Sequence, residues 1–152
     1  MPVVAIALGS NLGDRRAHLE WAAEQLTSVL INPRVSSLVE TDPFDVPDPQ
    51  PPYLNGAVVG ETHQTPRDIL AWLLALEQRR GRRRPSFRAP RTLDLDLIFF
   101  GEQIISEPDL VVPHARFRER TFVLGPLAEI APAMMDPETG KTVAELLAAI
   151  TA

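Results

Sequence analysis

The chain contains no cysteine, which excludes disulfide bonds and thiolate chemistry. It also has no long apolar run, because no stretch approaches the roughly 20 residues that a bilayer-spanning helix needs. The first apolar stretch, residues 3–8, is short and has no basic segment before it, so it does not resemble a signal peptide. These absences predict a cytoplasmic protein that makes no contact with a membrane.

Positive charge is also scarce, since the 152 residues carry a formal net charge of −5. A general nucleic-acid binder usually has a basic surface, so no nucleic-acid partner is expected. Seven of the 15 basic residues lie between positions 79 and 91, and all seven are arginine. Such a cluster indicates a small anionic ligand, because the guanidinium fork matches phosphate geometry. The alternative is a solvated helix end followed by a loop.

Apolar periodicity predicts a single domain, residues 1–152, in which strands and helices alternate. Strands are expected at residues 3–8, 35–41, 53–62 and 92–100, with two short ones at 103–106 and 110–112. Helices are expected after Asp14, after the Thr65–Pro66 cap, and at 117–130 and 143–150, while 42–52 and 79–91 read as loops. This order predicts an α+β fold, the ferredoxin-like split βαβ (βαββαβ) sandwich with helices on one face and a mostly helical C-terminal extension.

The sharpest chemical feature is the alternation of leucine and aspartate in residues 93–97. Alternate side chains of a strand share a face, so Asp94 and Asp96 are expected to stand side by side, opposite the leucines. Like charges this close raise one another's pKa unless a cation lies between them, and Mg²⁺ suits one or two carboxylates together with substrate phosphates. An ordinary solvent-facing strand is the alternative. The adjacent arginines favour phosphoryl transfer, which depends on positioning and charge neutralisation.

Neither a Walker loop nor a Gly-x-Gly-x-x-Gly fingerprint is present, and Gly9 to Gly13 reads as a turn into the first helix. Residues 82–96, which end in Ala-Pro-Arg-Thr-Leu-Asp-Leu-Asp, resemble the signature of the 6-hydroxymethyl-7,8-dihydropterin pyrophosphokinase family. The resemblance runs from about Val4 to Pro132, and its other marks fall in order along the chain. They are Ala7 to Leu12, Tyr53-Leu54-Asn55, Glu77 and Gly81, Val112-Pro113-His114, and Arg120-x-Phe122.

The resemblance implies an ATP-dependent diphosphotransferase of folate biosynthesis that acts on small molecules. The hydroxymethyl oxygen of the pterin would attack the β-phosphorus of ATP, and AMP would leave. Two Mg²⁺ ions would be bound by Asp94 and Asp96, and Asp96 is also a candidate base. A monomer is expected.

The resemblance also implies a role for each site residue. The catalytic residues would be Arg82, Arg91, Asp94 and Asp96. The ATP-binding residues would be Glu77, Arg84, Arg91, His114 and Arg120. The pterin-binding residues would be Thr41, Pro43, Tyr53, Asn55 and Phe122, with the two aromatic rings stacked on the pterin. The loops at 42–52 and 81–89 would close over the substrates.

Some positions depart from the family pattern. Arg88 and Ala89 stand where tryptophan and glycine are usual, and Leu74 and Ala115 stand where some members have polar nucleotide contacts. Three alternatives therefore stay open: an RNA-binding module, a ligand-sensing domain without turnover, and an enzyme that has lost activity. The first is disfavoured because the first expected strand carries no aromatic residue for base stacking.

Overall fold

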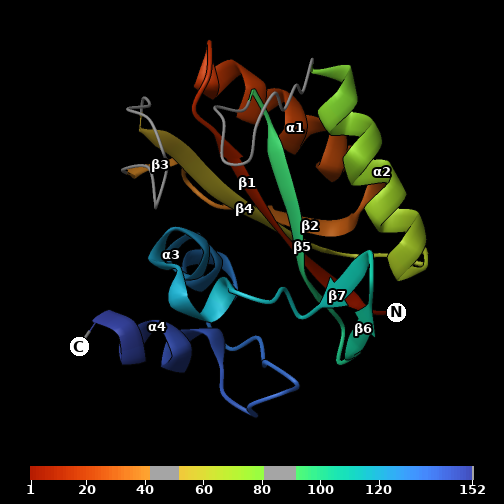
Figure 1. Cartoon of the computed structure of the whole chain (residues 1–152), viewed down its shortest axis with the longest axis vertical. Helices are drawn as coiled ribbons and strands as arrows, with labels where there is room; N and C mark the ends of the chain where they lie inside the picture. The colour runs from red at the N-terminus through yellow and green to blue at the C-terminus, as the bar shows by residue number, and fades with distance from the viewer. Residues whose placement is uncertain (42–51, 81–91, 152) are drawn as a thin grey trace.

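The computed structural model describes residues 1–41, 52–80 and 92–151, which form an antiparallel sheet with helices on both faces (Figure 1). None of the helices in these ranges is long and apolar enough to cross a bilayer. The strands are β1 (Val3–Ser10), β2 (Ile31–Val35), β3 (Val39–Thr41), β4 (Tyr53–Glu61), β5 (Asp94–Phe100), β6 (Ile105–Glu107) and β7 (Leu110–Val112). The helices are α1 (Arg15–Val29), α2 (Pro66–Arg79), the 3-10 turn η1 (Phe117–Glu119), α3 (Thr121–Ile130) and α4 (Val143–Thr151).

The main sheet has the strand order β2-β4-β1-β5, and β3 also pairs with β4. Strand β4 is therefore inserted between β1 and β2, the two strands that α1 connects. The strand expected at 35–41 is instead two short strands, β2 and β3. Ser36 lies at the break, where its Oγ accepts a hydrogen bond from the Ala57 N–H at 2.8 Å. Because this side chain takes the place of a backbone acceptor, the strand is interrupted there.

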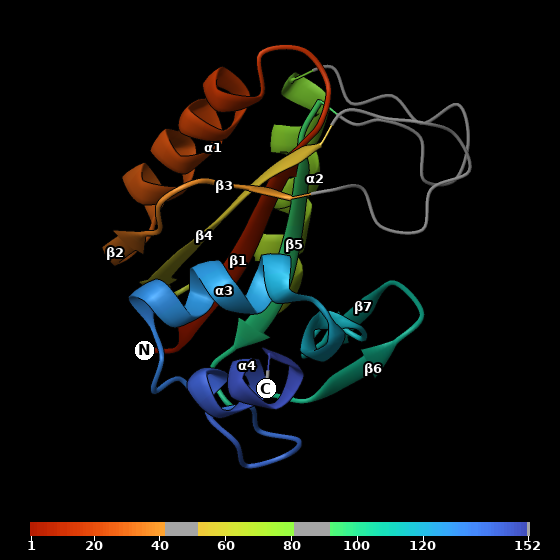
Figure 2. The same ribbon diagram turned by 90° about the vertical axis from the view of Figure 1, so that its left-hand side faces the viewer.

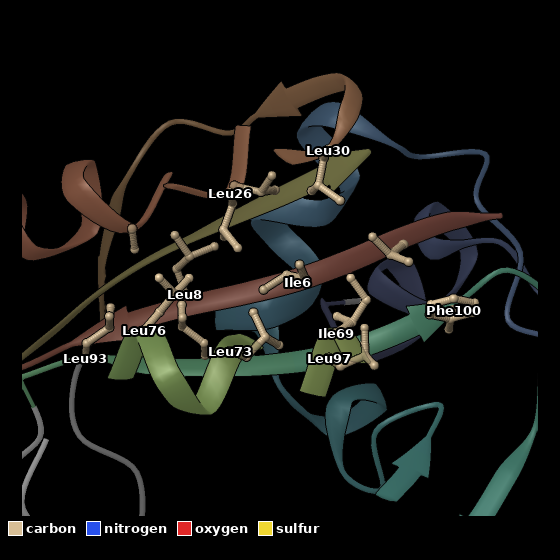
Figure 3. Close-up of a cluster of buried hydrophobic side chains, with 14 of the residues drawn as sticks. Ile6, Leu8, Leu26, Leu30, Ile69, Leu73, Leu76, Leu93, Leu97 and Phe100 are labelled. Atoms are coloured by element: carbon tan, nitrogen blue, oxygen red, sulfur yellow. The ribbon is translucent and has the colours of Figure 1, made fainter. Parts of the chain in front are cut away.

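The larger core lies between one face of the sheet and the helices α1 and α2, as Figure 3 shows. On α1 the apolar side chains recur at helical spacing, and on β1, β4 and β5 alternate residues point into this core. Each fully buried leucine here contributes roughly 1.5–3 kcal/mol to stability. The labelled members in Figure 3 are Ile6, Leu8, Leu26, Leu30, Ile69, Leu73, Leu76, Leu93, Leu97 and Phe100.

Helices α1 and α2 lie on one face of the sheet, and the C-terminal helices add a second layer that the sequence did not place. A second core lies on the opposite face, where α3 and α4 pack against the sheet, and Figure 2 shows α3 crossing the strands on the side away from α2. The strands present small residues to this layer, namely Ala5, Ala7 and Ala57. Small side chains let a helix approach the sheet closely, and apolar residues of α3 such as Leu124 and Leu127 fill the space.

The helix ends follow the capping signals in the sequence. Asp14 accepts from the Ala17 N–H at 3.1 Å, and Thr65 accepts from the Asp68 N–H at 3.1 Å. The helix expected over 117–130 is divided, because Arg120 is extended (φ −117°, ψ 102°) between η1 and α3. This division is important for the site described below, since it separates the residues on either side of Arg120.

Helices α1 and α2 are also joined at their ends by Arg80, the last described residue before 81–91. Its Nε donates to Nδ1 of His18 at 3.2 Å, and its guanidinium lies 4.9 Å from the centroid of the Trp21 ring. Burial lowers the pKa of His18, Arg80 lowers it further, and Asp14 acts in the opposite direction. His18 therefore stays neutral and keeps Nδ1 available as an acceptor at pH 7.

Candidate active site

The two carboxylates of β5 lie on the face predicted from the sequence. Leu93, Leu95 and Leu97 are buried in the larger core, whereas Asp94 and Asp96 are half-buried on the opposite face, the face that α3 covers farther along. Across the sheet, Asp94 is paired with Gly9 and Asp96 with Ala7. The neighbours on β1 are thus the smallest side chains available, and they leave space above the strand beside the carboxylates.

Glu77 supports β5 from the other side. It is 3% exposed on α2, and its Oε2 accepts a hydrogen bond at 2.8 Å from the N–H of Leu95, the residue between the two aspartates. Strand β5 is at the edge of the described sheet, so no neighbouring strand on that side offers a carbonyl to the Leu95 N–H. The contact fixes the backbone between Asp94 and Asp96. Within the described residues Glu77 therefore acts on the strand that carries the carboxylates.

His114 faces Asp96 from the segment of residues 114–120. Its Nε2 lies 3.9 Å from Asp96 Oδ1, and its backbone N–H donates to the carbonyl of Ile98 on β5 at 3.1 Å. Burial lowers the pKa of His114, Arg120 and Arg116 lower it further, and Asp94 opposes the shift. Nδ1 accepts from the Arg116 N–H at 3.3 Å, which assigns the proton of the neutral ring to Nε2, on the side of Asp96.

Arg120 brings a positive charge to the same place from the break between η1 and α3. Its Nε is buried and has no hydrogen-bond partner among the described residues. Its guanidinium lies 5.6 Å from the centroid of the Phe122 ring, in the first turn of α3. A buried guanidinium N–H without an acceptor is costly, so this geometry favours an anionic ligand beside Arg120.

Strands β3 and β4 carry a second group of polar and aromatic side chains. Thr41 Oγ1 donates to Asn55 Oδ1 at 2.5 Å, which leaves the amide NH₂ of Asn55 as a donor for other groups. Tyr53 is paired with Thr41 across the strands. A Cβ added to Gly9 would lie 3.1 Å from Asn55 Nδ2 and 3.5 Å from Tyr53 Cδ1. The glycine therefore permits both side chains to lie over β1.

The two groups of residues lie on one face of the sheet. Asn55, Gly9 and Asp94 are directly paired across β4, β1 and β5, and paired residues point their side chains to the same face. Two spacings of ~4.8 Å between neighbouring strands place Asn55 and Asp94 about 10 Å apart. Phe122 is at the beginning of α3, which packs against β3 and β4. The face thus has two ends. The flat, hydrogen-bonding end carries Tyr53 and Asn55, and the charged end carries Asp94 and Asp96 with His114 and Arg120 beside them.

Four of the predicted site residues lie outside the described residues: Pro43, Arg82, Arg84 and Arg91. The loops expected at 42–52 and 81–89 lie outside them as well, except for Pro52. Sequence reasoning missed two residues that take part in the site, Gly9 and Arg116. Gly9 had been assigned to a turn but lies inside β1, and the small-large alternation of β1 would have indicated its position.

The carboxylates fit a hard cation only together with a ligand that supplies further oxygen atoms. Among residues 1–41, 52–80 and 92–151, no group of three or more His, Cys, Asp or Glu side chains could hold a metal ion. Two carboxylates on one strand, beside a neutral histidine, match the incomplete protein coordination that Mg²⁺ accepts when phosphates complete its shell. The donor set is therefore compatible with magnesium in the presence of a phosphate substrate.

Comparisons with known proteins find relatives over most of the chain. The model of the 7,8-dihydro-6-hydroxymethylpterin-pyrophosphokinase (HPPK) family matches residues 5–132. The 2-amino-4-hydroxy-6-hydroxymethyldihydropteridine pyrophosphokinase of Synechocystis sp. is 42% identical over 93% of this chain and 73% of its own length. The enzyme of the same name from Pseudomonas aeruginosa is 42% identical over 96% of this chain and 90% of its own length.

A solved structure shares the fold. The HPPK-DHPS protein of Plasmodium falciparum superposes with a TM-score of 0.77 over 97% of this chain at 15% identity. This chain spans 44% of the length of that structure, so the likeness concerns only one part of it.

The contact between Glu77 and Leu95 gives a first prediction. Replacement Glu77→Ala removes the carboxylate that accepts from the buried Leu95 N–H, and we expect the free energy of unfolding to fall by about 1–3 kcal/mol. Urea denaturation measures the change. The exposed neighbour Gln78→Ala on the same helix is the control, and Glu77→Gln should recover most of the loss because its amide oxygen also accepts. An equal effect of Glu77→Ala and Gln78→Ala would refute the role.

Proposed function

Because the chain belongs to the 7,8-dihydro-6-hydroxymethylpterin-pyrophosphokinase family, we propose that it transfers the diphosphate of ATP to the hydroxymethyl group of 6-hydroxymethyl-7,8-dihydropterin. The products are AMP and the pterin diphosphate, and the reaction is a step of folate synthesis. One observation carries the proposal. A charged end, with Asp94, Asp96, His114 and Arg120, and a flat hydrogen-bonding end, with Asn55, share one face of the sheet.

The pterin is assigned to the end formed by β3 and β4. Asn55 offers its amide NH₂ to an acceptor on the pterin edge, since Thr41 already occupies its oxygen. Tyr53 and Phe122 supply the aromatic faces for offset stacking on the ring. Pro43 is assigned to the same end from the family resemblance. With the ring there, its hydroxymethyl group reaches toward Asp94, about 10 Å from Asn55 by strand spacing.

The triphosphate is assigned to the charged end. Arg120 directs a buried Nε without a described partner into this region, and His114 presents its Nε2 proton beside Asp96. Both groups can donate to phosphate oxygens. The family resemblance assigns three arginines to the same phosphates: Arg82, Arg84 and Arg91. Glu77 is assigned to the nucleotide side, where its hydrogen bond with the Leu95 N–H supports β5.

Asp94 and Asp96 are the residues that would hold magnesium, and we expect two ions. Bound there, magnesium would neutralise phosphate charge and lower the pKa of the acceptor hydroxyl. The chain itself orients the two substrates. The hydroxymethyl oxygen forms a bond to the β-phosphorus, the bond from that phosphorus to the α,β-bridging oxygen breaks, and AMP leaves in line. The hydroxyl proton passes to solvent or to Asp96, and Arg82 and Arg91 offset charge on the transferred group.

Three further assignments belong to this proposal. We class the sheet with ferredoxin-like sandwiches, supported by its β2-β4-β1-β5 order and antiparallel pairing. We also expect the enzyme to act as a monomer and in the cytoplasm. These assignments do not bear on the chemistry of the site.

A direct assay tests the function. The purified protein is incubated with ATP, magnesium and 6-hydroxymethyl-7,8-dihydropterin, and AMP is followed over time with EDTA as the control. We expect AMP only when both the pterin and magnesium are present. ADP in place of AMP would indicate an ordinary kinase. Pterin binding without any product would indicate a ligand-sensing domain or an enzyme that has lost activity.

The carboxylate assignment predicts loss of activity without loss of the fold. For Asp94→Asn and Asp96→Asn we expect kcat to fall by roughly 100- to 1,000-fold, the scale expected when one charge-stabilising group is lost. Both side chains are half-buried and the replacements are isosteric, so the urea midpoint should change little. Glu102→Gln, an exposed carboxylate just after β5, is the matched control. Turnover close to the wild type in either aspartate variant would exclude the assignment.

The close approach at Gly9 predicts an effect on the pterin alone. In Gly9→Ala the new Cβ would lie 3.1 Å from Asn55 Nδ2 and would push this side chain aside. We expect KM for the pterin to rise by roughly 2- to 10-fold, which corresponds to one hydrogen bond of about 0.5–1.5 kcal/mol, and KM for ATP to stay constant. Gly125→Ala is the control, because nothing lies within 4 Å of its added Cβ. An unchanged pterin KM, or an equal rise for both substrates, would contradict the assignment.

A further inference from the structure

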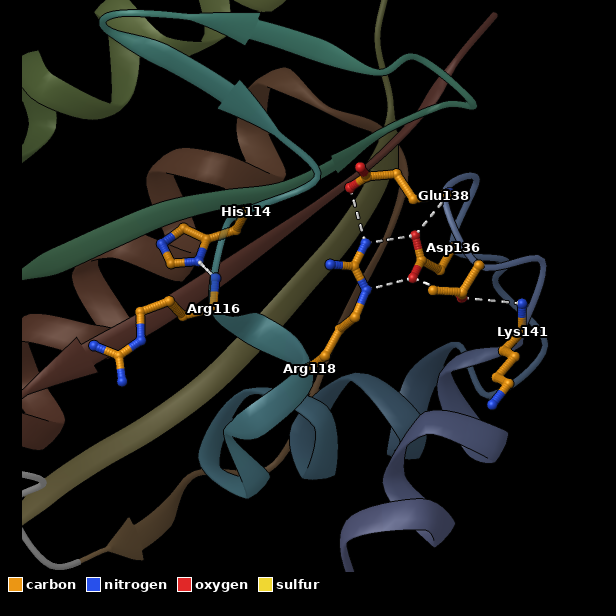
Figure 4. Close-up of polar contacts among 7 residues, drawn as sticks. His114, Arg116, Arg118, Asp136, Glu138 and Lys141 are labelled. Carbon is orange, nitrogen blue, oxygen red and sulfur yellow. Dashed lines mark hydrogen bonds and ion pairs between the residues drawn. The ribbon is translucent and has the colours of Figure 1, made fainter.

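The turn at residues 132–142 contains a buried carboxylate that has no part in the site described above. The side chain of Asp136 is 0% exposed. It accepts hydrogen bonds from Arg118 Nε at 2.6 Å, Arg118 Nη2 at 3.0 Å, the Glu138 N–H at 3.0 Å and Thr139 Oγ1 at 2.8 Å (Figure 4). Four donors satisfy this carboxylate, and two of them form the bidentate fork of one arginine.

Arg118 lies in the middle of the segment that carries the charged end of the site. His114 is four residues before it and Arg120 is two residues after it. In Figure 4 the Arg118 guanidinium reaches the turn around Asp136, while the His114 ring lies on the far side of the segment. The neighbouring Phe117 is fully buried, packs edge-to-face on Phe99 of β5 with ring centroids 5.0 Å apart, and has the Arg118 guanidinium 4.6 Å from its own centroid.

The segment cannot hold this shape by its own backbone. Its regular part is η1, three residues long, with backbone bonds from Glu119 N to Arg116 O at 3.3 Å and from Arg120 N to Phe117 O at 3.1 Å. Such short 3-10 turns have poor hydrogen-bond geometry and little stability of their own. The segment is therefore held from outside. His114 N bonds to the Ile98 carbonyl at one end and α3 follows at the other, while the buried Phe117 ring and the contact of Arg118 with Asp136 hold the middle.

The ion pair of Arg118 and Asp136 also stays charged near neutral pH. Burial raises the pKa of Asp136, but hydrogen bonds from Arg118, Thr139 and Glu138 lower it by more, so its net shift is downward. The hydrogen bond to Asp136 raises the pKa of Arg118. Asp136 thus remains ionised, and its contact with Arg118 is charged on both sides.

We propose that Arg118 and Asp136 are positioning residues for the triphosphate, because their ion pair fixes the segment that presents His114 and Arg120 to Asp94 and Asp96. The proposal rests on the proposed function, which assigns those four residues to ATP. It makes the turn at 132–142, which carries none of the residues assigned to substrates, part of the machinery for nucleotide binding. Of the residues assigned to the pterin, Thr41, Tyr53 and Asn55 lie on β3 and β4, and Phe122 lies in α3, outside the segment of residues 114–120.

The test uses Arg118→Met and Asp136→Asn in the full chain. With magnesium present, we measure Kd of a non-hydrolysable ATP analogue by calorimetry, Kd of the pterin by its fluorescence, and both KM values. We expect Kd and KM for the nucleotide to rise by about 10- to 100-fold, the cost of misplacing positioning groups by about 1 Å, and the pterin values to stay within about twofold. The nucleotide Kd of the double variant should not exceed that of the single variant with the higher Kd, because both changes break the same contact between Arg118 and Asp136.

Two controls separate positioning from stability. Arg67→Met breaks a bidentate contact of the same kind, to Asp109 at 3.0 and 3.1 Å, but Arg67 and Asp109 are both exposed and lie outside the site. Ile69→Val, in the core on the other face, lowers stability mildly. Both should leave the nucleotide Kd unchanged. Arg118→Lys keeps the charge and one hydrogen bond but loses the fork, so it should recover part of the affinity.

The outcomes are distinct. Equal losses for nucleotide and pterin, or a nucleotide Kd unchanged in folded Arg118→Met, Arg118→Lys and Asp136→Asn, would overturn the positioning role. If Arg118→Met does not fold, the Arg118→Lys and Asp136→Asn variants decide the matter. If the wild type binds the ATP analogue but never forms AMP, the proposed function fails, while the change in analogue affinity still tests the positioning role.

Discussion

The site depends above all on the alternation of side chains along β5. Leu93, Leu95 and Leu97 are buried against α1 and α2, and this burial fixes which face Asp94 and Asp96 occupy. A slip of one residue would exchange the two faces and put both carboxylates into the core. The strand is at the edge of the sheet, so β1 holds it from one side only. Glu77 supplies the contact on the other side through the Leu95 N–H, and it does so between the two aspartates.

The opposite face of β1 is shaped by small residues. Ala5 and Ala7 let α3 pack closely, whereas Gly9, one step farther along the same face, is left for Asn55 and Tyr53 to approach. The α3 and α4 layer packs on the part of this face with the alanines, and the part with Gly9 and Asp94 carries the candidate site. The second face of β1 thus belongs partly to a core and partly to the candidate site. The boundary lies between Ala7 and Gly9, which differ by one methyl group.

Much of this arrangement could be predicted from residues 3–30 and 53–100, because periodicity and caps are local signals. The strands predicted at 3–8, 53–62 and 92–100, the caps at Asp14 and Thr65, and the common face of Asp94 and Asp96 are confirmed. The break between β2 and β3 depends on Ser36 bonding to Ala57, 21 residues away, which no local pattern reveals. The division at Arg120 was missed for a similar reason, since helix periodicity continues through it. The second helical layer could not be placed because a sequence does not say which face of a sheet its tail covers.

Charge pairs are equally hard to predict from the sequence. Residues that are far apart along the chain can form a buried ion pair, and the sequence does not show which pairs are buried. Arg118 and Arg67 each meet an aspartate through a bidentate contact. The partners of Arg67 are exposed, and a solvated pair contributes at most about 1 kcal/mol. Asp136 is fully buried, so removing its arginine would leave a carboxylate without its main partner in the interior. Between His114 and Arg120 the regular structure is the three-residue turn η1, which resists such a change only weakly. The tail beyond α3 therefore affects the charged end of the site through a carboxylate 16 residues after Arg120, and only the folded chain shows this connection.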